Sequence, residues 1–419
     1  MTMEYSRALR LLDKYLGSCI CFLFSLVHAL RRRPQDKTIR KVLVIELFEI
    51  GASIMAHSSL RQITRALPDV ELYCLCLEST KEPWLLLGDI PRKNVYALDN
   101  SSLVAWAFSI LKISRALSKE NIDLIIDFEL FTRASAIIAF LIRAKYRSGF
   151  YRYTMEGLYR GTFYDIKCSF NQNMHIVRNL LALTKSAVSL STKYHNYDGP
   201  IPRSDITTAS YVSVKTKEAA VREKLRDAYP GFTNQRILIV NPTVGRVLPM
   251  RDYPKEQFVK VIQELLVRYP EHLVVLTGTP AHGPVTEYIH QSVNDPRCIN
   301  FRGQTVTIAE FLELCLIADL LISNDSGPAH FASMTPLKIL ALYGPESPHM
   351  YGPLGNAVCL YKFFHSSPMY HAYDHKNPPE NETDSMRVIT PDDVVNMVET
   401  LLKGKATYLT INNELPYLP

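Results

Sequence analysis

Short apolar runs alternate with segments of helical spacing along most of this chain of 419 residues. Residues 41–47 (KVLVIEL) and 70–77 (VELYCLCL) have the continuous apolar character of buried strands, whereas residues 54–68 repeat apolar side chains at helical spacing. The run NIDLIIDFEL at 121–130 continues the pattern and lies between two further helical segments. Strands separated by helices require crossover connections, so the pattern predicts a parallel sheet.

The alternation is interrupted between about residues 185 and 235, where turn residues and a charged helical segment replace it. It resumes with predicted strands at 236–242 (RILIVNP), 272–278 and 317–325, again with helical segments between them. The sequence therefore predicts two parallel-sheet domains in tandem, with their junction in the interrupted region.

An uncharged apolar segment lies near the N-terminus. Residues 15–30 (YLGSCICFLFSLVHAL) contain no Asp, Glu, Lys or Arg and stand directly before RRRP. A helix of this length extends about 24 Å, against roughly 30 Å of bilayer hydrocarbon. We therefore predict a monotopic or re-entrant anchor in one leaflet, with Arg31, Arg32 and Arg33 on anionic headgroups. A helix buried against the protein and a single membrane span are the alternatives.

Charge and cysteine content narrow the functional classes. The net charge is +6, and residues 1–41 alone hold nine Lys or Arg against three Asp or Glu. The rest of the chain is therefore balanced, which argues against a nucleic-acid groove. Eight cysteines occur without a CxxC pair or a His cluster spaced for zinc, which favours a reduced cytosolic compartment.

The densest candidate site is NDSGPAH at 324–330, after a predicted strand. Ligands of open parallel sheets bind beyond the carboxyl ends of the strands. The free N–H groups and the dipole of a helix beginning at Pro328 predict an anion site for a diphosphate, with Gly327 allowing close approach. In the alternative interpretation Asp325 or Ser326 only caps the helix, and His330 is an ordinary core histidine.

A second candidate loop, NPTVGRVLPMRDYP, follows the strand at 236–242. Thr243 and Gly245 are candidates for backbone contact, and Arg246 or Arg251 has the geometry to clamp a diphosphate. The alternative is a solvated surface loop. No Walker A, GxGxxG or GxSxG sequence follows the leading strands, which removes the main support for ATPase, dinucleotide-binding and serine-hydrolase functions.

With these motifs the chain resembles the bacterial heptosyltransferase-related glycosyltransferases, family 9. The resemblance rests on LISNDSGPAHFASMTPLKILALYGPESP, on VLVIELFEIGASIMAHSSLRQITRALPDVEL and on FRGQTVTIAEFLELCLIADLLIS, and it spans about residues 41–403. It implies an α/β GT-B fold, with two Rossmann-like parallel-sheet domains facing across a cleft, here with an N-terminal apolar helix added. It also implies inverting transfer with no metal and no cofactor other than the nucleotide-diphosphate-sugar used as donor substrate.

The resemblance also assigns site residues. Those implied to bind the donor are Thr243, Arg251, Asp325, Ser326, Gly327, His330, Gly344 and Pro345. Arg251 stands where the family usually has Lys.

On the acceptor side, the loop with Gly51 and Ala52 departs from the family pattern, because the family has an Asp directly after this Gly as its general base. Alanine cannot take a proton. We predict that Glu49, three residues earlier, replaces it as the catalytic base, with Glu46 also close in sequence. Otherwise Glu49 is a surface residue, and another base acts or catalysis is lost.

The sequence thus predicts a chain of six segments. They are a membrane-associating helix (1–40), an N-terminal acceptor domain (41–200), a linker (201–235), a C-terminal donor domain (236–389), a C-terminal helix (390–403) that begins with Thr390 as N-cap, and a tail (404–419).

We predict an inverting glycosyltransferase that moves heptose or a similar sugar to a saccharide or lipid-linked acceptor, in lipopolysaccharide core or envelope glycan synthesis. Its expected partners are a nucleotide sugar, a saccharide or glycolipid acceptor and an anionic membrane surface, with no nucleic acid. Its expected location is the cytoplasmic face of the bacterial inner membrane. The alternatives are a catalytically silent GT-B protein with a regulatory or assembly role at the membrane, and a nucleotide-sugar epimerase.

Overall fold

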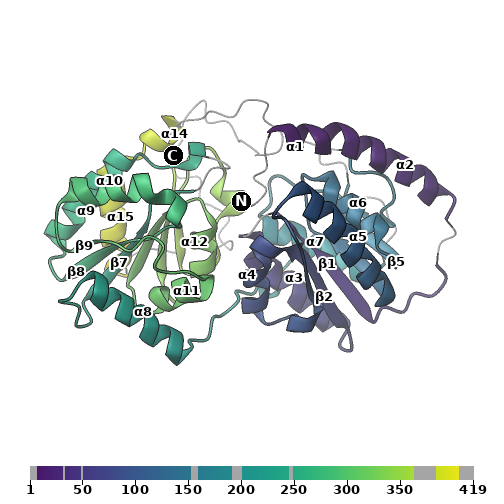
Figure 1. Cartoon of the computed structure of the whole chain (residues 1–419), viewed down its shortest axis with the longest axis horizontal. Helices are drawn as coiled ribbons and strands as arrows, with labels where there is room; N and C mark the ends of the chain where they lie inside the picture. The colour runs from purple at the N-terminus through teal and green to yellow at the C-terminus, as the bar shows by residue number, and fades with distance from the viewer. Residues whose placement is uncertain are drawn as a thin grey trace. The chain divides into compact units, whose positions relative to one another are not determined.

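The computed structural model divides into two compact units, Met1–Thr207 and Thr208–Pro419 (Figure 1). It describes residues 7–31, 34–48, 51–151, 159–190, 201–244, 249–362 and 384–404. Each unit contains one six-stranded sheet in which every strand pairs in parallel with its neighbours. The strands can pair in parallel because helical segments separate the apolar runs along the chain, and two parallel strands need such a crossover between them.

The sheet of the first unit has the order β3-β2-β1-β4-β5-β6. Its strands are β1 (Lys41–Ile45), β2 (Glu71–Leu77), β3 (Val95–Leu98), β4 (Ile122–Asp127), β5 (Ala144–Phe150) and β6 (Ile166–Cys168). The chain proceeds outward from β1 to β3 on one side and from β4 to β6 on the other. The topological switch point, where such sheets bind ligands, therefore lies between β1 and β4.

Helices cover both faces of this sheet. They are α3 (Ala52–Ala66), α4 (Lys81–Leu87), α5 (Leu103–Lys119), α6 (Arg133–Leu141) and α7 (Ile176–Val188), with short 3-10 turns at Glu78–Thr80, Arg92–Asn94 and Arg203–Asp205. Right-handed crossovers in the two outward directions place α3 on one face and α5 and α6 on the other. Helix α7 packs against α3.

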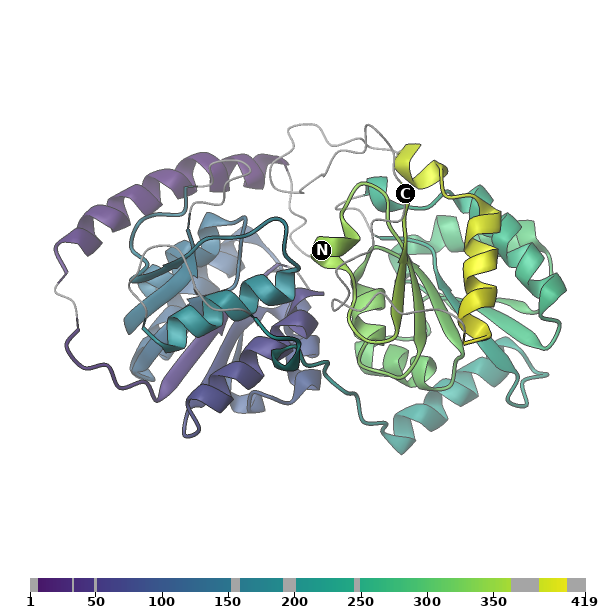
Figure 2. The same cartoon turned by 180° about the vertical axis from the view of Figure 1, so that it is seen from behind.

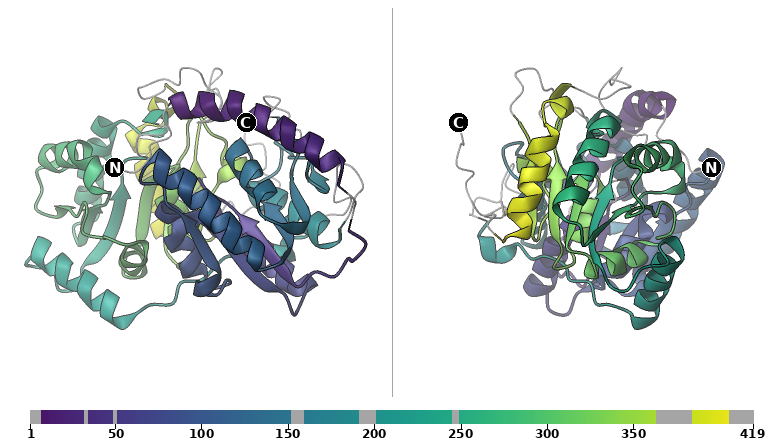
Figure 3. Two further views of the ribbon diagram at one scale, coloured as in Figure 1. Left: turned by 45° about the vertical axis from the view of Figure 1, so that its right-hand side comes forward. Right: turned by 90° about the vertical axis from the view of Figure 1, so that its left-hand side faces the viewer.

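The N-terminal segment forms an almost continuous helix on the outside of the first unit (Figure 3). It comprises α1 (Arg7–Leu12), the π-helical turn η1 (Asp13–Gly17) and α2 (Ser18–Ala29). Helix α2 packs against α6, where the rings of Phe24 and Phe140 stack with centroids 4.2 Å apart. Cys21 and Ser25 are buried there, while Phe22 and Leu23, on the side away from α6, are 55% and 58% exposed.

This helix is longer than its sequence pattern predicts. The apolar helical run Leu9–Ala29 has 21 residues and is long and apolar enough to cross a membrane. At 1.5 Å per residue it extends about 32 Å, so the argument that the segment is too short to span is wrong. The pattern misses the first turns because Asp13 and Lys14 interrupt the apolar run.

The sheet of the second unit has the order β12-β11-β10-β7-β8-β9. Its strands are β7 (Arg236–Asn241), β8 (His272–Leu276), β9 (Cys298–Asn300), β10 (Leu320–Asn324), β11 (Lys338–Leu342) and β12 (Ala357–Leu360). Its switch point lies between β7 and β10, which pair directly, with Leu320 opposite Leu238. Strand side chains such as Val240, Ile322 and Leu340 are fully buried in one core cluster.

Helices also connect and flank the strands of the second unit. They are α8 (Lys215–Ala228), α9 (Lys255–Arg268), α10 (Gly283–Val293), α11 (Ile308–Leu316), α12 (Gly327–Ala332), α13 (Pro348–Tyr351), α14 (Asp384–Arg387) and α15 (Pro391–Leu402), with 3-10 turns at Pro249–Arg251 and Pro280–His282. Helix α8 packs against α11, so this part of the predicted linker belongs to the second unit. Helix α15 packs against α9 (Figure 2), and its predicted N-cap Thr390 is confirmed by a capping box with Asp393.

Candidate functional site

A buried ion-pair cluster joins three loops at the carboxyl edge of the second sheet. Arg251, at the end of the turn after β7, places Nη1 3.2 Å from Asp325 Oδ2 and Nη2 2.9 Å from Glu346 Oε1. Asp325 directly follows β10, and Glu346 follows β11. The structure therefore brings together two predicted site residues, Arg251 and Asp325, and adds a carboxylate that the sequence did not indicate.

Burial determines the electrostatics of this cluster. Asp325 and Glu346 are 4% and 3% exposed. Burial would lower the pKa of Arg251, but the two carboxylates more than offset this, and its pKa lies above the ordinary value. Burial raises the pKa of Asp325, against the opposing effect of the Arg251 charge. The guanidinium is thus permanently charged and is held in one orientation by two partners.

Hydrogen bonds to Asn324 and Asp252 fix the loops on both sides of the switch point. Asn324, the last residue of β10, donates to the carbonyl of Pro242 at 2.9 Å and accepts from the backbone N–H of Tyr253 at 3.2 Å. The carboxylate of Asp252 accepts from the N–H of Val244 at 2.7 Å. These bonds hold the loop that follows β7 against the end of β10.

Thr243 and Ser326 lie at this same edge. Thr243 is buried, and its hydroxyl contacts no hydrogen-bonding group among the described residues. Ser326 is the N-cap residue of α12, but its side chain bonds to Ser323 and to the carbonyl of Asn324 and makes no cap hydrogen bond. The interpretation of Ser326 as an ordinary side-chain cap is therefore wrong, because its hydroxyl turns back toward β10.

His330 lies in α12 and is 7% exposed. Burial, with the charge of Arg251 as the second cause, lowers the pKa of His330 to about 4. Its Nδ1 has no hydrogen-bond partner among the described residues. At neutral pH the imidazole is uncharged and can donate through one nitrogen and accept through the other.

The remaining predicted donor residues differ in their surroundings. Gly327 is the first residue of α12, which has six residues. The side chain of Met386 occupies the space that a Cβ on Gly344 would need, so a larger residue there would have to displace it. Pro345, between Gly344 and Glu346, is buried. Gly245 and Arg246 lie outside the described residues.

In the first unit one carboxylate holds the loop that follows β1. Glu129, two residues after β4, is 4% exposed, and its Oε1 accepts from the N–H groups of Leu47 at 2.7 Å and Phe48 at 2.9 Å. The hydroxyl of Thr80 donates to the carbonyl of Leu47 at 3.1 Å. The loop is thus fixed from its two neighbouring strands, across the β1–β4 switch point.

The predicted catalytic base, Glu49, lies outside the described residues, directly after this fixed stretch. Glu46 is buried at its start, 5% exposed. Gly51 has φ of −73°, a conformation open to any residue, and Ala52 begins α3. The backbone therefore does not itself demand glycine at position 51.

The N-terminal helix reaches this same edge through Asp13. Its Oδ1 accepts from the backbone N–H groups of Arg133 and Ala134, both at 3.0 Å, and from the hydroxyl of Thr132 at 3.1 Å. A carboxylate at the start of α6 complements the positive end of the helix dipole. The π-turn that contains Asp13 places it in this position.

Sequence reasoning assigned no role to Glu346 or Glu129, and it included Asn324 in the 324–330 stretch without a role of its own. The signal for Glu346 was an acid directly after a Gly-Pro that ends a strand, and the signal for Glu129 was an acid just after the buried run at 122–127. Within the ranges that the structure describes, no group of three or more His, Cys, Asp or Glu side chains could hold a metal ion. That transfer needs no metal stays a prediction.

Comparison with known proteins places the chain among sugar transferases. Residues 110–374 match the model of glycosyltransferase family 9 (heptosyltransferase). Lipooligosaccharide heptosyltransferase 2 of Haemophilus ducreyi is 24% identical over 370 residues, which cover 86% of this chain and 99% of that protein. Its counterpart from Haemophilus influenzae is 26% identical over 153 residues, covering 36% of this chain and 43% of that protein.

A solved structure shows the same fold. The structure of Escherichia coli ADP-heptose LPS heptosyltransferase II superposes with a TM-score of 0.67 at 18% identity, covering 87% of this chain and 99% of that one. The predicted GT-B fold, with two Rossmann-like units and an N-terminal apolar helix, is confirmed.

Proposed function

Because this chain belongs to glycosyltransferase family 9, we propose that it transfers heptose or a similar sugar from a nucleotide-diphosphate-sugar to a saccharide or lipid-linked acceptor. The observation that carries the proposal is the buried cluster of Arg251, Asp325 and Glu346 at the β7–β10 switch point. Open α/β sheets bind nucleotides at this place.

The polar groups at this edge match the two parts of a nucleotide sugar. Carboxylates such as Asp325 accept hydrogen bonds from sugar hydroxyls. The Arg251 guanidinium, the unpartnered hydroxyl of Thr243 and neutral His330 supply hydrogen-bond donors for a diphosphate. The two carboxylates hold the guanidinium in place, so little reorganisation is needed when charge develops on the leaving group.

The proposed reaction is a single displacement. The carboxylate of Glu49 takes the proton of the acceptor hydroxyl, whose oxygen then bonds to the anomeric carbon of the donor. The bond from that carbon to the nucleotide diphosphate breaks with inversion, and the released charge is stabilised by Arg251 and by the first N–H groups of α12. Glu129 holds the backbone N–H groups of Leu47 and Phe48, which come directly before Glu49 in the sequence.

We infer further that the enzyme acts on envelope glycans at the cytoplasmic face of the bacterial inner membrane, without a metal. The support is the naming of its relatives as lipooligosaccharide heptosyltransferases, together with the apolar outer side of the N-terminal helix. An amphipathic helix docked on the first unit would keep that unit where a lipid-linked acceptor lies.

Two measurements on the full chain test the proposal. Calorimetry with a panel of nucleotide sugars and nucleotide diphosphates should detect binding, and Arg251→Ala should weaken it. If none of these ligands binds, the donor site is wrong. A turnover assay should show that Glu49→Gln reduces transfer by about 10²–10⁴-fold while donor binding is kept. Unchanged turnover in that variant would remove Glu49 as the base.

One observation favours a second function, a catalytically silent partner at the membrane. Ala52 stands where the resemblance implies the catalytic Asp. Donor binding with no transfer to any acceptor, in wild type and in Ala52→Asp alike, would support this alternative. Transfer gained only in Ala52→Asp would show that the natural chain has lost its base.

A further inference from the structure

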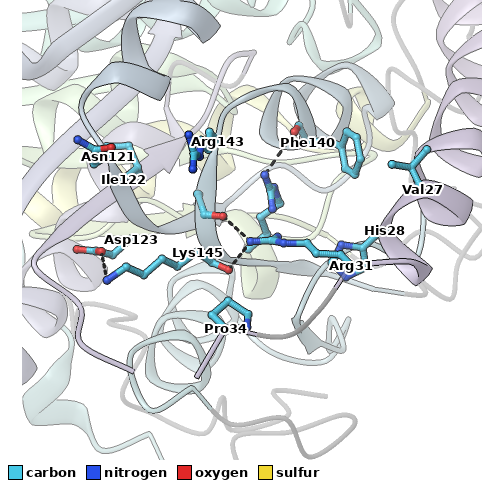
Figure 4. Close-up of a pocket in the computed structure, with 12 residues that line it drawn as sticks. Val27, His28, Arg31, Pro34, Asn121, Ile122, Asp123, Phe140, Arg143 and Lys145 are labelled. Carbon is cyan, nitrogen blue, oxygen red and sulfur yellow. Dashed lines mark hydrogen bonds and ion pairs between the residues drawn. The ribbon is translucent and has the colours of Figure 1, made fainter. Parts of the chain in front are cut away.

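A pocket lined by several arginines lies at the opposite edge of the first sheet, where β4 and β5 begin (Figure 4). It has a volume of about 710 Å³ and is lined by the end of α2 and by residues of both strands. This volume lies within the range of roughly 300–1,000 Å³ that is typical of small-ligand sites. No part of the proposed transfer reaction uses this pocket.

The pocket has more cationic groups than its carboxylates neutralise. Lys145 is paired, with Nζ 2.8 Å from Asp123 and 2.6 Å from Asp36. Arg31, Arg143 and Arg147 also line the pocket, and none of these three has a carboxylate ion-pair partner within the described residues. Three guanidinium groups therefore line one hollow without an ion-pair partner among the described residues, and Asp165, which accepts from the backbone N–H of Arg147 at 2.9 Å, offsets only part of the positive charge. This excess of cationic groups favours an anionic occupant.

Two of these arginines are held by backbone carbonyls. One N–H group of Arg31 donates to the carbonyls of Ala144 and Lys145, at 2.8 and 3.0 Å. Arg147 is 5% exposed and donates to the carbonyls of Ala139 and Ile142, both at 2.7 Å. These bonds orient the guanidinium groups without forming ion pairs, and the charge of Asp165 offsets part of that of Arg147. In Figure 4 the Arg31 side chain extends across the hollow toward the start of β5.

The positive charges of Arg31 and Arg147 repel each other. Burial, followed by the charge of Arg31, lowers the pKa of Arg147 to about 10. The group remains protonated at neutral pH. Arg143 is exposed, and its side chain makes no hydrogen bond or ion pair within the described ranges. An anion bound here would reduce the repulsion between the Arg31 and Arg147 charges. It could also accept hydrogen bonds from the guanidinium of Arg143 at the mouth of the pocket.

The pocket is continuous with an apolar surface. Val27 lines it and is 59% exposed, and on the same helix Leu26 is 54% and Leu30 88% exposed. A soluble anion would leave this hydrocarbon surface in water. A phospholipid satisfies both parts, because its phosphate lies next to acyl chains at the membrane interface.

We propose that this pocket binds the headgroup phosphate of an anionic phospholipid, held by Arg31 and Arg143 over the charge of Arg147. The inference rests on the membrane association within the proposed function and is independent of sugar transfer. Asp13 joins the other end of the same helix to the carboxyl edge of the sheet, next to the loop of the proposed base. A lipid bound at Arg31 would thus fix how the acceptor edge is presented to the membrane.

Flotation of the full chain with vesicles tests the site. The vesicles contain phosphatidylcholine alone, or equal amounts of phosphatidylcholine and phosphatidylglycerol. Wild type should prefer the anionic vesicles, and Arg143→Ala should weaken that binding by about fivefold. The matched control is Arg61→Ala, an exposed arginine on α3, on the other face of the sheet, which should bind like wild type.

Arg143→Lys separates a built site from diffuse attraction. It keeps the charge but removes the planar guanidinium. A specific phosphate site therefore predicts weaker vesicle binding, whereas diffuse electrostatic attraction predicts binding equal to that of wild type. Equal binding of wild type, Arg143→Ala and Arg61→Ala would overturn the site while leaving the anchor intact. If wild type floats with neither vesicle, the membrane association itself is wrong. Calorimetric binding of inorganic phosphate as tight as vesicle binding would identify a soluble ligand and also overturn the proposal.

Discussion

The carboxyl edges of the two sheets are built from the same strand order by different means. In the second unit, ion pairs between side chains join the loops, with Arg251 between Asp325 and Glu346. In the first unit, Asp127 at the end of β4 forms a buried ion pair with Arg160 at 2.6 Å, and two further carboxylates bond to backbone N–H groups, Glu129 to the loop after β1 and Asp13 to the start of α6. The charged side chains of the second edge therefore join loop to loop, whereas Glu129 and Asp13 in the first edge fix the backbone.

This difference matches the two tasks of a transferase. A donor diphosphate brings negative charge, so its edge needs a cation whose orientation does not change during the reaction. An acceptor hydroxyl is neutral, so its edge needs above all a well-placed base, and placement is a matter of backbone geometry. The comparison predicts that donor binding depends on the charges around Arg251, and that turnover depends on the hydrogen bonds that hold the loop after β1.

The largest effect should follow from Arg251→Ala. Removal of the guanidinium leaves two buried carboxylates without compensation, which lowers the free energy of unfolding by about 3–5 kcal/mol. Urea denaturation measures this loss. Arg268→Ala, which breaks surface ion pairs to Glu264 and Glu399, is the matched control and should cost about 0–1 kcal/mol. Similar losses in both variants would mean that the Arg251 cluster is not a buried one in solution.

A pH effect should come from His330. Because the folded-state pKa of His330 is about 4, the unfolded chain binds more protons between pH 4 and the ordinary histidine pKa of 6.5. His330 therefore adds to stability above pH 6.5 and loses that contribution as the pH falls toward 4, by at most about 3 kcal/mol.

Wild type should consequently lose more stability than His330→Gln when the unfolding curves at pH 7 and pH 4.5 are compared. The difference between the two proteins isolates His330 from Asp325, whose raised pKa acts in the opposite direction on acidification. Identical pH profiles would place the imidazole in water, contrary to its burial.

In the first unit, Glu129→Ala should lower the free energy of unfolding by about 1–3 kcal/mol, because it leaves the N–H groups of Leu47 and Phe48 without their acceptor. It should also lower kcat with little change in donor affinity. Glu129→Gln keeps an acceptor oxygen and should recover most of the activity. A variant that weakens donor binding instead would contradict the division of labour between the two edges.

A smaller effect, about 1–3 kcal/mol, should come from Asp13→Ala. Thr132 still accepts from Ala134 at the start of α6, but the buried guanidinium of Arg133, 3.5 Å from Asp13, loses its carboxylate partner. Thermal unfolding measures it. Asp36→Ala, which removes an exposed partner of Lys145, is a control for loss of a surface carboxylate. An Asp13→Ala protein as stable as this control would show that the Asp13 carboxylate contributes nothing to the stability of α6.

The central strands of both sheets could be predicted because each is a continuous apolar run. Strand β5 could not, because its sequence AKYRSGF contains Lys145 and Arg147. Arg147 is tolerated there only because the carbonyls at the end of α6 satisfy it. The edge strands β3, β6, β9 and β12 have three or four residues each, too few for a periodic signal.

The donor motif was visible in the sequence because its residues are consecutive and follow a strand. Glu346 and Glu129 were not, because each acts on residues about 80 or more positions away, and one sequence contains no record of such pairs. Glu49 stays a prediction, since its role depends on where a loop places one carboxylate.

The order of apolar runs and turns along the chain was enough to specify two parallel sheets, an apolar N-terminal helix and the candidate ligand-binding loops, because these depend on local spacing and composition. The partners of the charged groups were set by folding, which buries Arg251 between two carboxylates and turns the hydroxyl of Ser326 away from the helix it begins. Folding also gathers Arg31, Arg143 and Arg147 around one pocket. The energy of a charge depends on its burial and its neighbours, and both come from segments far apart in the chain.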